Sequence, residues 1–249
     1  MGSLLAVGVV LTALASSGLV RLILSVKCTL DALMNYLAHL YLASDHPEAV
    51  LGSLMGDFVK GEVDQGLPAM LRHSIIEHRR IDSFTDAHPI VQQSKRRLMP
   101  EYRRYGGILI DMFYDHFLAT AWDDHARVSL DIFRKRVYQV FADSHADLPA
   151  RMQRTATYLV EYDLLGSYRR IEGIDSALKG VATRLSRPSP LGLARIELER
   201  LYAELQEDFS QFFPELIRFV DSESIDVNVA FEAGYWHRVR NSLNLKAQQ

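Results

Sequence analysis

The stretch from residue 77 to residue 86 reads EHRRIDSFTD and carries potential metal ligands at intervals of four residues. Positions four apart lie on one face of an α-helix, so this spacing places His78, Asp82 and Asp86 in a single stripe. An imidazole and carboxylates are ligands that Mg²⁺, Mn²⁺, Fe²⁺ and Zn²⁺ use in proteins. Because one helix cannot enclose an ion, the stripe predicts that other helices bring further ligands to it.

Two other segments supply such ligands. Asp57 lies upstream between a glycine and a phenylalanine, and a nearly all-apolar run at residues 107–122 contains Asp111, Asp115 and His116. A helix that is apolar on all sides is expected in the centre of a fold. Buried carboxylates are costly unless they are paired or bound to a metal, and neighbouring carboxylates repel unless a cation neutralises them. The pattern favours one shared metal site over isolated capping aspartates and core histidines.

The rest of the chain predicts helices and almost no strands. Apolar residues recur at helical spacing between glycine and proline breaks, and alternating apolar–polar runs are lacking. The expected helices cover residues 35–43, 48–59, 68–84, 90–98, 107–122, 130–142, 152–164, 171–185 and 191–213. The last of these is expected to be one long surface helix. We therefore predict a single all-α domain over residues 34–221.

Composition limits the functional classes. The chain has 249 residues, 48% hydrophobic and 24% charged, which is typical of a globular protein with a sizeable core. A net charge of −3 argues against a nucleic-acid partner. The single cysteine, Cys28, excludes an internal disulfide framework and favours a reducing compartment, the cytoplasm. Glycine-rich phosphate loops and a G-x-S-x-G nucleophile are absent from the sequence.

The two ends of the chain differ from this domain. Residues 3–20 are uncharged and apolar, at the lower limit for a membrane span, which needs about 20 residues. Residues 1–33 therefore have three interpretations: a membrane anchor, a signal peptide, or a segment upstream of a true start at Met34. Membrane association is expected only if they belong to the working protein. Residues 222–249 lack helical periodicity and are predicted to form a tail.

Four motifs occur in a familiar order and spacing: MNYLAHL from Met34, GDFVKG from Gly56, HRRIDSFTD from His78 and D-x-x-x-DHFL from Asp111. They resemble the acyl carrier protein phosphodiesterases, a family distantly related to the HD-type metal-dependent phosphohydrolases. The resemblance covers about residues 34–215 and includes the later segment GVATRLSRP. Members typically begin at the first motif, which favours Met34 as the true start.

The resemblance implies an HD-like helical arrangement and a specific reaction. The enzyme would hydrolyse the phosphodiester that joins 4′-phosphopantetheine to a serine of holo acyl carrier protein. Mn²⁺ is the expected metal, with Mg²⁺ or Fe²⁺ as alternatives. This sequence departs from the usual HD order, because its pairs are His78 with Asp82 and the reversed Asp115-His116.

The predicted metal ligands are Asp57, His78, Asp82, Asp115 and His116. His39, from a separate helix, is the candidate proton donor to the leaving serine oxygen, or a residue that supports the ligands. Arg79, Lys60 and, more weakly, Arg184 are predicted to hold phosphate oxygens. A surface salt bridge is the alternative for Arg79 and Lys60.

Two other functions stay open. One is an HD-like phosphohydrolase that acts on a nucleotide or another small phosphoester with the same metal site. The other is a non-enzymatic helical module, tethered by residues 1–33, that binds no metal. Basic clusters such as residues 95–97 and 134–136 are ordinary solvated helix faces in most proteins, but they also offer docking sites for an acidic carrier protein.

Overall fold

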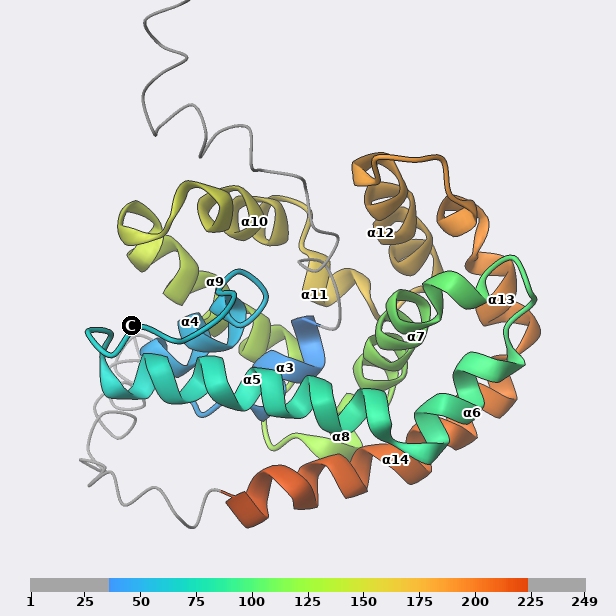
Figure 1. Ribbon diagram of the computed structural model, residues 1–249, viewed down its shortest axis with the longest axis horizontal. Helices are drawn as coiled ribbons and strands as arrows, with labels where there is room; N and C mark the ends of the chain where they lie inside the picture. The colour runs from blue at the N-terminus through green and yellow to red at the C-terminus, as the bar shows by residue number, and fades with distance from the viewer. Residues whose placement is uncertain (1–35, 224–249) are drawn as a thin grey trace, which may run out of the picture.

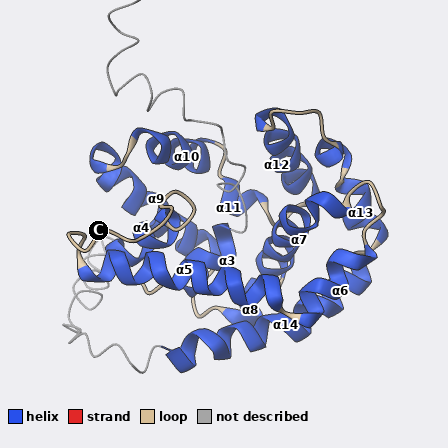
Figure 2. Cartoon of the chain, viewed as in Figure 1, coloured by secondary structure: helices blue, strands red, loops and turns tan. Residues whose placement is uncertain are grey.

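In a computed structural model of the chain, residues 36–223 are described, and every regular element among them is a helix (Figure 2). The elements are α3 (Tyr36–Leu42), α4 (Pro47–Met55), α5 (Ala69–Ala87), α6 (Pro89–Arg97), η1 (Arg103–Tyr105), α7 (Gly106–Thr120), α8 (Trp122–His125), α9 (Leu130–Ser144), η2 (His145–Asp147), α10 (Ala150–Glu161), α11 (Leu164–Ser167), α12 (Ile171–Arg184), η3 (Pro190–Leu193), α13 (Arg195–Arg200) and α14 (Tyr202–Glu223). The prediction of a single all-α domain is confirmed.

The predictions for residues 1–33, and for nearly all of 222–249, fall outside the described residues. Within the part that the structure describes, no helix combines the length and the apolar character that crossing a membrane requires.

Helix α7 forms the centre of the core. All its residues except Gly107, Asp111 and Thr120 are buried, as its apolar sequence predicts. It packs against α3, α6, α12 and α14. Helix α5 packs mainly against α4, and Figure 1 shows it running across the front of the molecule. The predicted helix over residues 107–122 in fact ends at Thr120, and a separate short helix, α8, begins at Trp122.

The junction between α5 and α6 follows from local chemistry. His88 follows the last residue of α5, and its extended backbone stops the helix. The same residue caps α6, because its side chain accepts a hydrogen bond from the amide of Ile90. Pro89 fits the first turn of α6, where its missing N–H costs nothing. Both helices therefore begin and end within a few residues of their predicted bounds.

The prediction of one surface helix over residues 191–213 is wrong. That segment divides into η3, α13 and the first half of α14, with breaks at Ala194 and Leu201. Leu198, Leu201 and Leu205 are all buried, so the chain turns between helices to keep each of them in the core. Buried Glu197 fixes α13 further, because its carboxylate accepts a hydrogen bond from the Met99 amide at 2.7 Å. Tertiary packing overrides the continuous helical period here.

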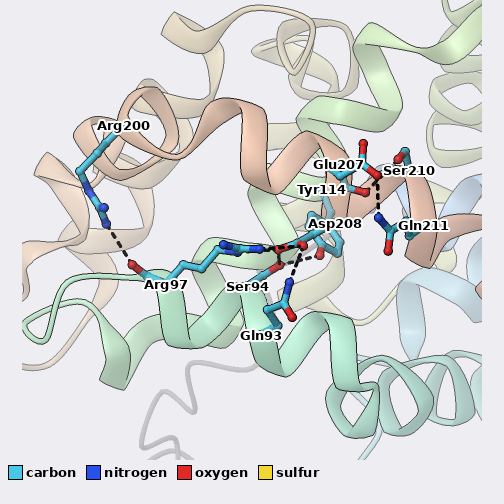
Figure 3. Close-up of polar contacts among 9 residues, drawn as sticks. All are labelled: Gln93, Ser94, Arg97, Tyr114, Arg200, Glu207, Asp208, Ser210 and Gln211. Atoms are coloured by element: carbon cyan, nitrogen blue, oxygen red, sulfur yellow. Dashed lines mark hydrogen bonds and ion pairs between the residues drawn. The ribbon is translucent and has the colours of Figure 1, made fainter.

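A buried polar network joins α14 to α6 and α7 (Figure 3). The carboxylate of Asp208, which is 3% exposed, accepts hydrogen bonds from Ser94 at 2.7 Å and from Gln93 and Arg97 at 3.0 Å. The Ser94 hydroxyl also lies 2.9 Å from that of Tyr114 on α7. Each buried polar group of this network has a partner, as a stable interior requires. The network holds α6 and α14 against α7, the helix whose first turns line the pocket described next.

Candidate metal centre and its pocket

Four side chains from three parts of the fold meet at α5. His39 on α3 places its Nε2 atom 3.0 Å from Oδ1 of Asp82 on α5. The Nε2 atom of His78, one turn earlier on α5, lies 3.3 Å from Asp82 Oδ2 and 3.4 Å from Oδ1 of Asp57. The two imidazole rings stack with their centroids 3.8 Å apart. One ligand atom each from His39, His78 and Asp82 lies within 4.8 Å of the others, a spacing that a single metal ion can bridge.

Glycine at position 56 allows this approach. A Cβ atom on Gly56 would come within 2.2 Å of the His78 ring, and one on Gly52 would come within 2.6 Å of the Leu71 carbonyl oxygen. Only glycine fits at such distances, so α4 packs closely against α5. Helix α4 ends at Met55, earlier than predicted, and the turn that follows brings Asp57 to His78.

Asp115 on α7 fixes the helix that carries His39. Its two carboxylate oxygens accept hydrogen bonds from the amides of Leu37 and Ala38, each at 2.9 Å. These are first-turn amides of α3, which have no partner within the helix. Ser53 on α4 adds a hydrogen bond to the carbonyl of His39. The position of His39 therefore depends on α7 and α4 together.

Several buried atoms of this group have no hydrogen-bond partner among the described residues. They are Nδ1 of His39, Oδ2 of Asp57, and both ring nitrogens of His78, whose Nε2 faces two carboxylates without hydrogen-bond geometry. Buried polar atoms are normally satisfied, so this group is an exception that needs an explanation. A divalent cation fits this donor set, because two imidazoles and two carboxylates are ligands that Mn²⁺, Fe²⁺ and Zn²⁺ accept.

The group is electrostatically coupled. Burial by itself lowers the pKa of His78, but the carboxylates of Asp57 and Asp82 outweigh burial and raise it to about 9. Burial and the neighbouring His78 lower the pKa of His39. Burial favours the neutral form of Asp82, but its contacts with His39 and His78 reverse that effect and lower its pKa. The carboxylates therefore attract one positive charge, which either a proton or a metal ion can supply.

The group borders an open cavity of about 360 Å³. Its walls come from the turn after α4, from α5 and from the start of α7, and comprise Gly56, Asp57, Val59, Lys60, Gly61, Arg79, Asp82, Thr85, Asp86, Gly107 and Asp111. This volume lies within the range of small-molecule sites. A ligand in the cavity would contact the predicted ligands Asp57 and Asp82 directly.

Of the three predicted phosphate-binding residues, two line the cavity and one does not. Lys60 and Arg79 both line the cavity. Arg79 also donates hydrogen bonds to the backbone carbonyls of Val59 and Gly61, at 2.6 and 2.7 Å, so it holds the turn after α4 in place. Arg184 does not line this cavity, and its guanidinium lies over the ring of Tyr158, 4.7 Å from the centroid.

Asp115 and His116 direct their polar atoms to partners outside the group of potential ligands. Asp115 binds the start of α3, as described above. His116 has Nδ1 2.7 Å from the carbonyl oxygen of Tyr168 and Nε2 3.2 Å from the hydroxyl of Tyr202. Their role as metal ligands stays a prediction.

Three polar side chains that line the cavity, Thr85, Asp86 and Asp111, are not among the predicted site residues. Asp111 carries a sequence signal, an acid within an apolar helix, but is not among the predicted ligands. Nothing in the sequence marks Thr85 as a site residue except its position three residues after Asp82 on the same helix.

The fold and this group of side chains define a class of protein. It is an all-α protein with two buried histidines, a buried aspartate and a half-exposed aspartate beside an open pocket, a donor set that metal-using hydrolases employ. Residues 34–216 match the sequence model of the family described as acyl carrier protein phosphodiesterase. The chain belongs to this family.

Curated relatives support the assignment. A protein of Yersinia pestis named acyl carrier protein phosphodiesterase is 32% identical over 193 residues, which cover 77% of this chain and all of the relative. Proteins of the same name from Photorhabdus laumondii and Enterobacter sp. (strain 638) are 33% and 34% identical, over 76% and 74% of this chain and 96% of each relative. No solved structure is significantly similar to this chain.

Proposed function

We propose that this protein is a metal-dependent phosphodiesterase that removes 4′-phosphopantetheine from holo acyl carrier protein and leaves the apo protein. Membership of the family and the name shared by its relatives support the substrate. The single observation that carries the metal dependence is the group of His39, His78 and Asp82, with unpartnered buried atoms at the edge of the cavity. Mn²⁺ is the proposed metal, with Mg²⁺ or Fe²⁺ as alternatives.

In this proposal His39, His78, Asp82 and Asp57 hold the metal. A divalent cation held by these residues would supply a Lewis acid that can polarise a phosphoryl oxygen and lower the pKa of water. His39 is proposed as a ligand rather than as the proton donor, because its Nε2 atom faces Asp82 inside the group. Asp115 and His116 are proposed to support the surrounding helices, since both use their polar atoms on other partners.

Lys60 and Arg79 are proposed to set the charge at one end of the cavity. Both are cationic and both line it beside Asp57. They would attract the phosphodiester, and the hydrogen bonds from Arg79 to the turn would keep Lys60 and Asp57 in place. Arg184 lies outside this cavity, so we assign it no contact with the phosphate.

The remaining proposals concern the chain as a whole. We propose residues 34–221 as the catalytic domain, with an HD-like arrangement of its helices, and Met34 as the start of the working protein. The cytoplasm is proposed as its compartment, since a single cysteine in the whole chain favours a reducing environment. The basic clusters at residues 95–97 and 134–136 are proposed to dock the acidic carrier protein, each through its exposed member, Arg96 or Lys135.

The decisive experiment incubates the full chain with holo acyl carrier protein and Mn²⁺ and follows the intact mass of the carrier. We expect the carrier to lose the mass of phosphopantetheine, and we expect EDTA to block the loss. An Asp143→Asn variant, which changes an exposed acid on α9, serves as the active control. An unchanged carrier mass would contradict the proposal. Turnover of nucleotides in the same preparation would then favour the small-phosphoester alternative, which the cavity of about 360 Å³ also suits.

A further inference from the structure

The proposed metal chemistry uses only one end of the cavity. Along α5 the cavity wall continues from Arg79 past Asp82 to Thr85 and Asp86. Seven residues of helix span about 10 Å, so the cavity extends well beyond the metal group. The first turns of α7 complete its far end with Gly107 and Asp111. We call the part lined by Thr85, Asp86, Gly107 and Asp111 the α7 end of the cavity.

The two ends of the cavity differ in charge. Lys60 and Arg79 line the end beside the turn after α4, whereas Asp86 and Asp111 line the α7 end. Asp86 is paired with Lys95 at 2.7 Å. Enclosure by protein raises the pKa of Asp111 well above its usual range, and the nearby acids add to that shift against the opposing effect of Lys95. A phosphate group is therefore attracted to the turn end and gains nothing from the α7 end.

The α7 end offers hydrogen-bonding groups to an uncharged ligand. Thr85 is only 6% exposed, and its Oγ1 atom has no hydrogen-bond partner among the described residues. A buried hydroxyl without a partner costs free energy that a bound ligand can recover. Asp111 lines the same part of the cavity, and its carboxyl oxygens can accept hydrogen bonds from amide and hydroxyl groups of a ligand. A Cβ atom on Gly107 would meet no atom within 4 Å, so the wall beside Asp111 borders open space.

An apolar hollow accompanies these polar groups. Thr85 and Asp111 also line a second cavity of about 20 Å³, and its remaining walls are aliphatic and aromatic residues of α3, α5, α7 and α14. A cavity of this size has room for little more than a methyl group or a single water molecule. The α7 end thus combines hydrogen-bonding groups with a small apolar surface.

We propose that the α7 end binds the uncharged pantetheine arm of the substrate, with Thr85 and Asp111 as specificity-determining residues. This inference rests on the proposed function. The arm carries amides and a hydroxyl, which match the hydrogen-bonding groups, and a pair of methyl groups, one of which the small apolar hollow can hold. The phosphodiester then lies between the arm and the carrier protein, beside Lys60 and Arg79.

The test compares two inhibitors of holo carrier hydrolysis, free pantetheine and inorganic phosphate. Thr85→Val keeps the shape of the side chain and removes its hydroxyl, so we expect the inhibition constant of pantetheine to rise about five-fold. Gly107→Leu places bulk in the open space, and we expect a rise of at least about ten-fold. Inhibition by phosphate should not change in either variant. Lys60→Gln is the matched control and should weaken inhibition by phosphate more than inhibition by pantetheine.

The outcomes separate this inference from the proposed function. If the wild-type protein does not release phosphopantetheine, the proposed function fails. If the wild type is active but pantetheine does not inhibit it, or inhibits it equally in Thr85→Val and Gly107→Leu, the assignment of the α7 end is wrong while the function stands. Circular dichroism and thermal unfolding of each variant verify that the fold is intact.

Discussion

Two buried acidic sites of this protein have opposite characters. Asp208 accepts hydrogen bonds from Ser94, Gln93 and Arg97, so its buried carboxylate is fully satisfied within the fold (Figure 3). Asp57 and His78 are also buried, yet Asp57 Oδ2 and both His78 nitrogens have no hydrogen-bond partner in the described part of the chain. Burial of an acid alone therefore does not indicate a functional site. Buried polar atoms that have no hydrogen-bond partner do indicate one, because they can still bind a ligand.

The largest expected effect comes from removing a carboxylate at the unsatisfied site. Asp82→Asn keeps the size of the side chain but removes the charge that faces both histidines. We expect kcat/KM for holo carrier protein to fall on the order of a thousand-fold, because a metal ligand is lost. Because the Asp82 side chain is 48% exposed, we expect the free energy of unfolding in EDTA to change by no more than about 1 kcal/mol. Wild-type activity in this variant would refute the metal site.

The same substitution at the satisfied site should have the reverse effect. Asp208→Asn leaves Arg97 without its charged partner and cannot accept all the hydrogen bonds that Asp208 accepts. We expect a loss of about 3 kcal/mol in the free energy of unfolding, measured by urea denaturation. Activity of the folded variant at low temperature should stay within about two-fold of wild type. A large loss of kcat without a loss of stability would show that the two sites are not separate.

Replacing Asp115 should have a smaller effect, on the pH dependence of the free energy of unfolding. Burial raises its pKa from 3.8 to about 7, against the opposing effect of the Leu37 and Ala38 amides. Between about pH 4 and pH 7 the folded protein then binds more protons at Asp115 than the unfolded chain, so this contribution to stability falls as the pH rises. The wild-type free energy of unfolding, minus that of Asp115→Asn, should decrease by up to about 1 kcal/mol per pH unit.

Both proteins are measured metal-free in EDTA. The titration of groups that wild type and Asp115→Asn share then cancels in the difference between their free energies of unfolding. Above about pH 7 the difference should become constant. A difference that instead grows with pH would show that the α3 amides, rather than burial, dominate the titration of Asp115.

The sequence predicts the local part of the site well. The four-residue spacing of His78 and Asp82 depends only on helix geometry, and the structure places both on α5 beside the cavity wall. The fold class follows in the same way from helical periodicity. These features need no knowledge of contacts between distant segments.

Long-range features could not be predicted from the same patterns. Asp115 and Asp111 both appear as acids in an apolar helix, but one binds amides 77 and 78 residues away and the other faces the cavity. The division of residues 191–213 into separate helices depends on packing of Leu198 and Leu201 in the core. The need for glycine at position 56 follows only from the packing of the His78 ring against it, which the sequence does not reveal.

The most direct test of the account is a calorimetric titration of the metal-free full chain with Mn²⁺. We predict that the wild type binds Mn²⁺, that Asp82→Asn weakens binding at least about ten-fold, and that Asp208→Asn binds like the wild type. Equal binding by wild type and Asp82→Asn, or no binding by either, would contradict the claim that the unsatisfied group is a metal site.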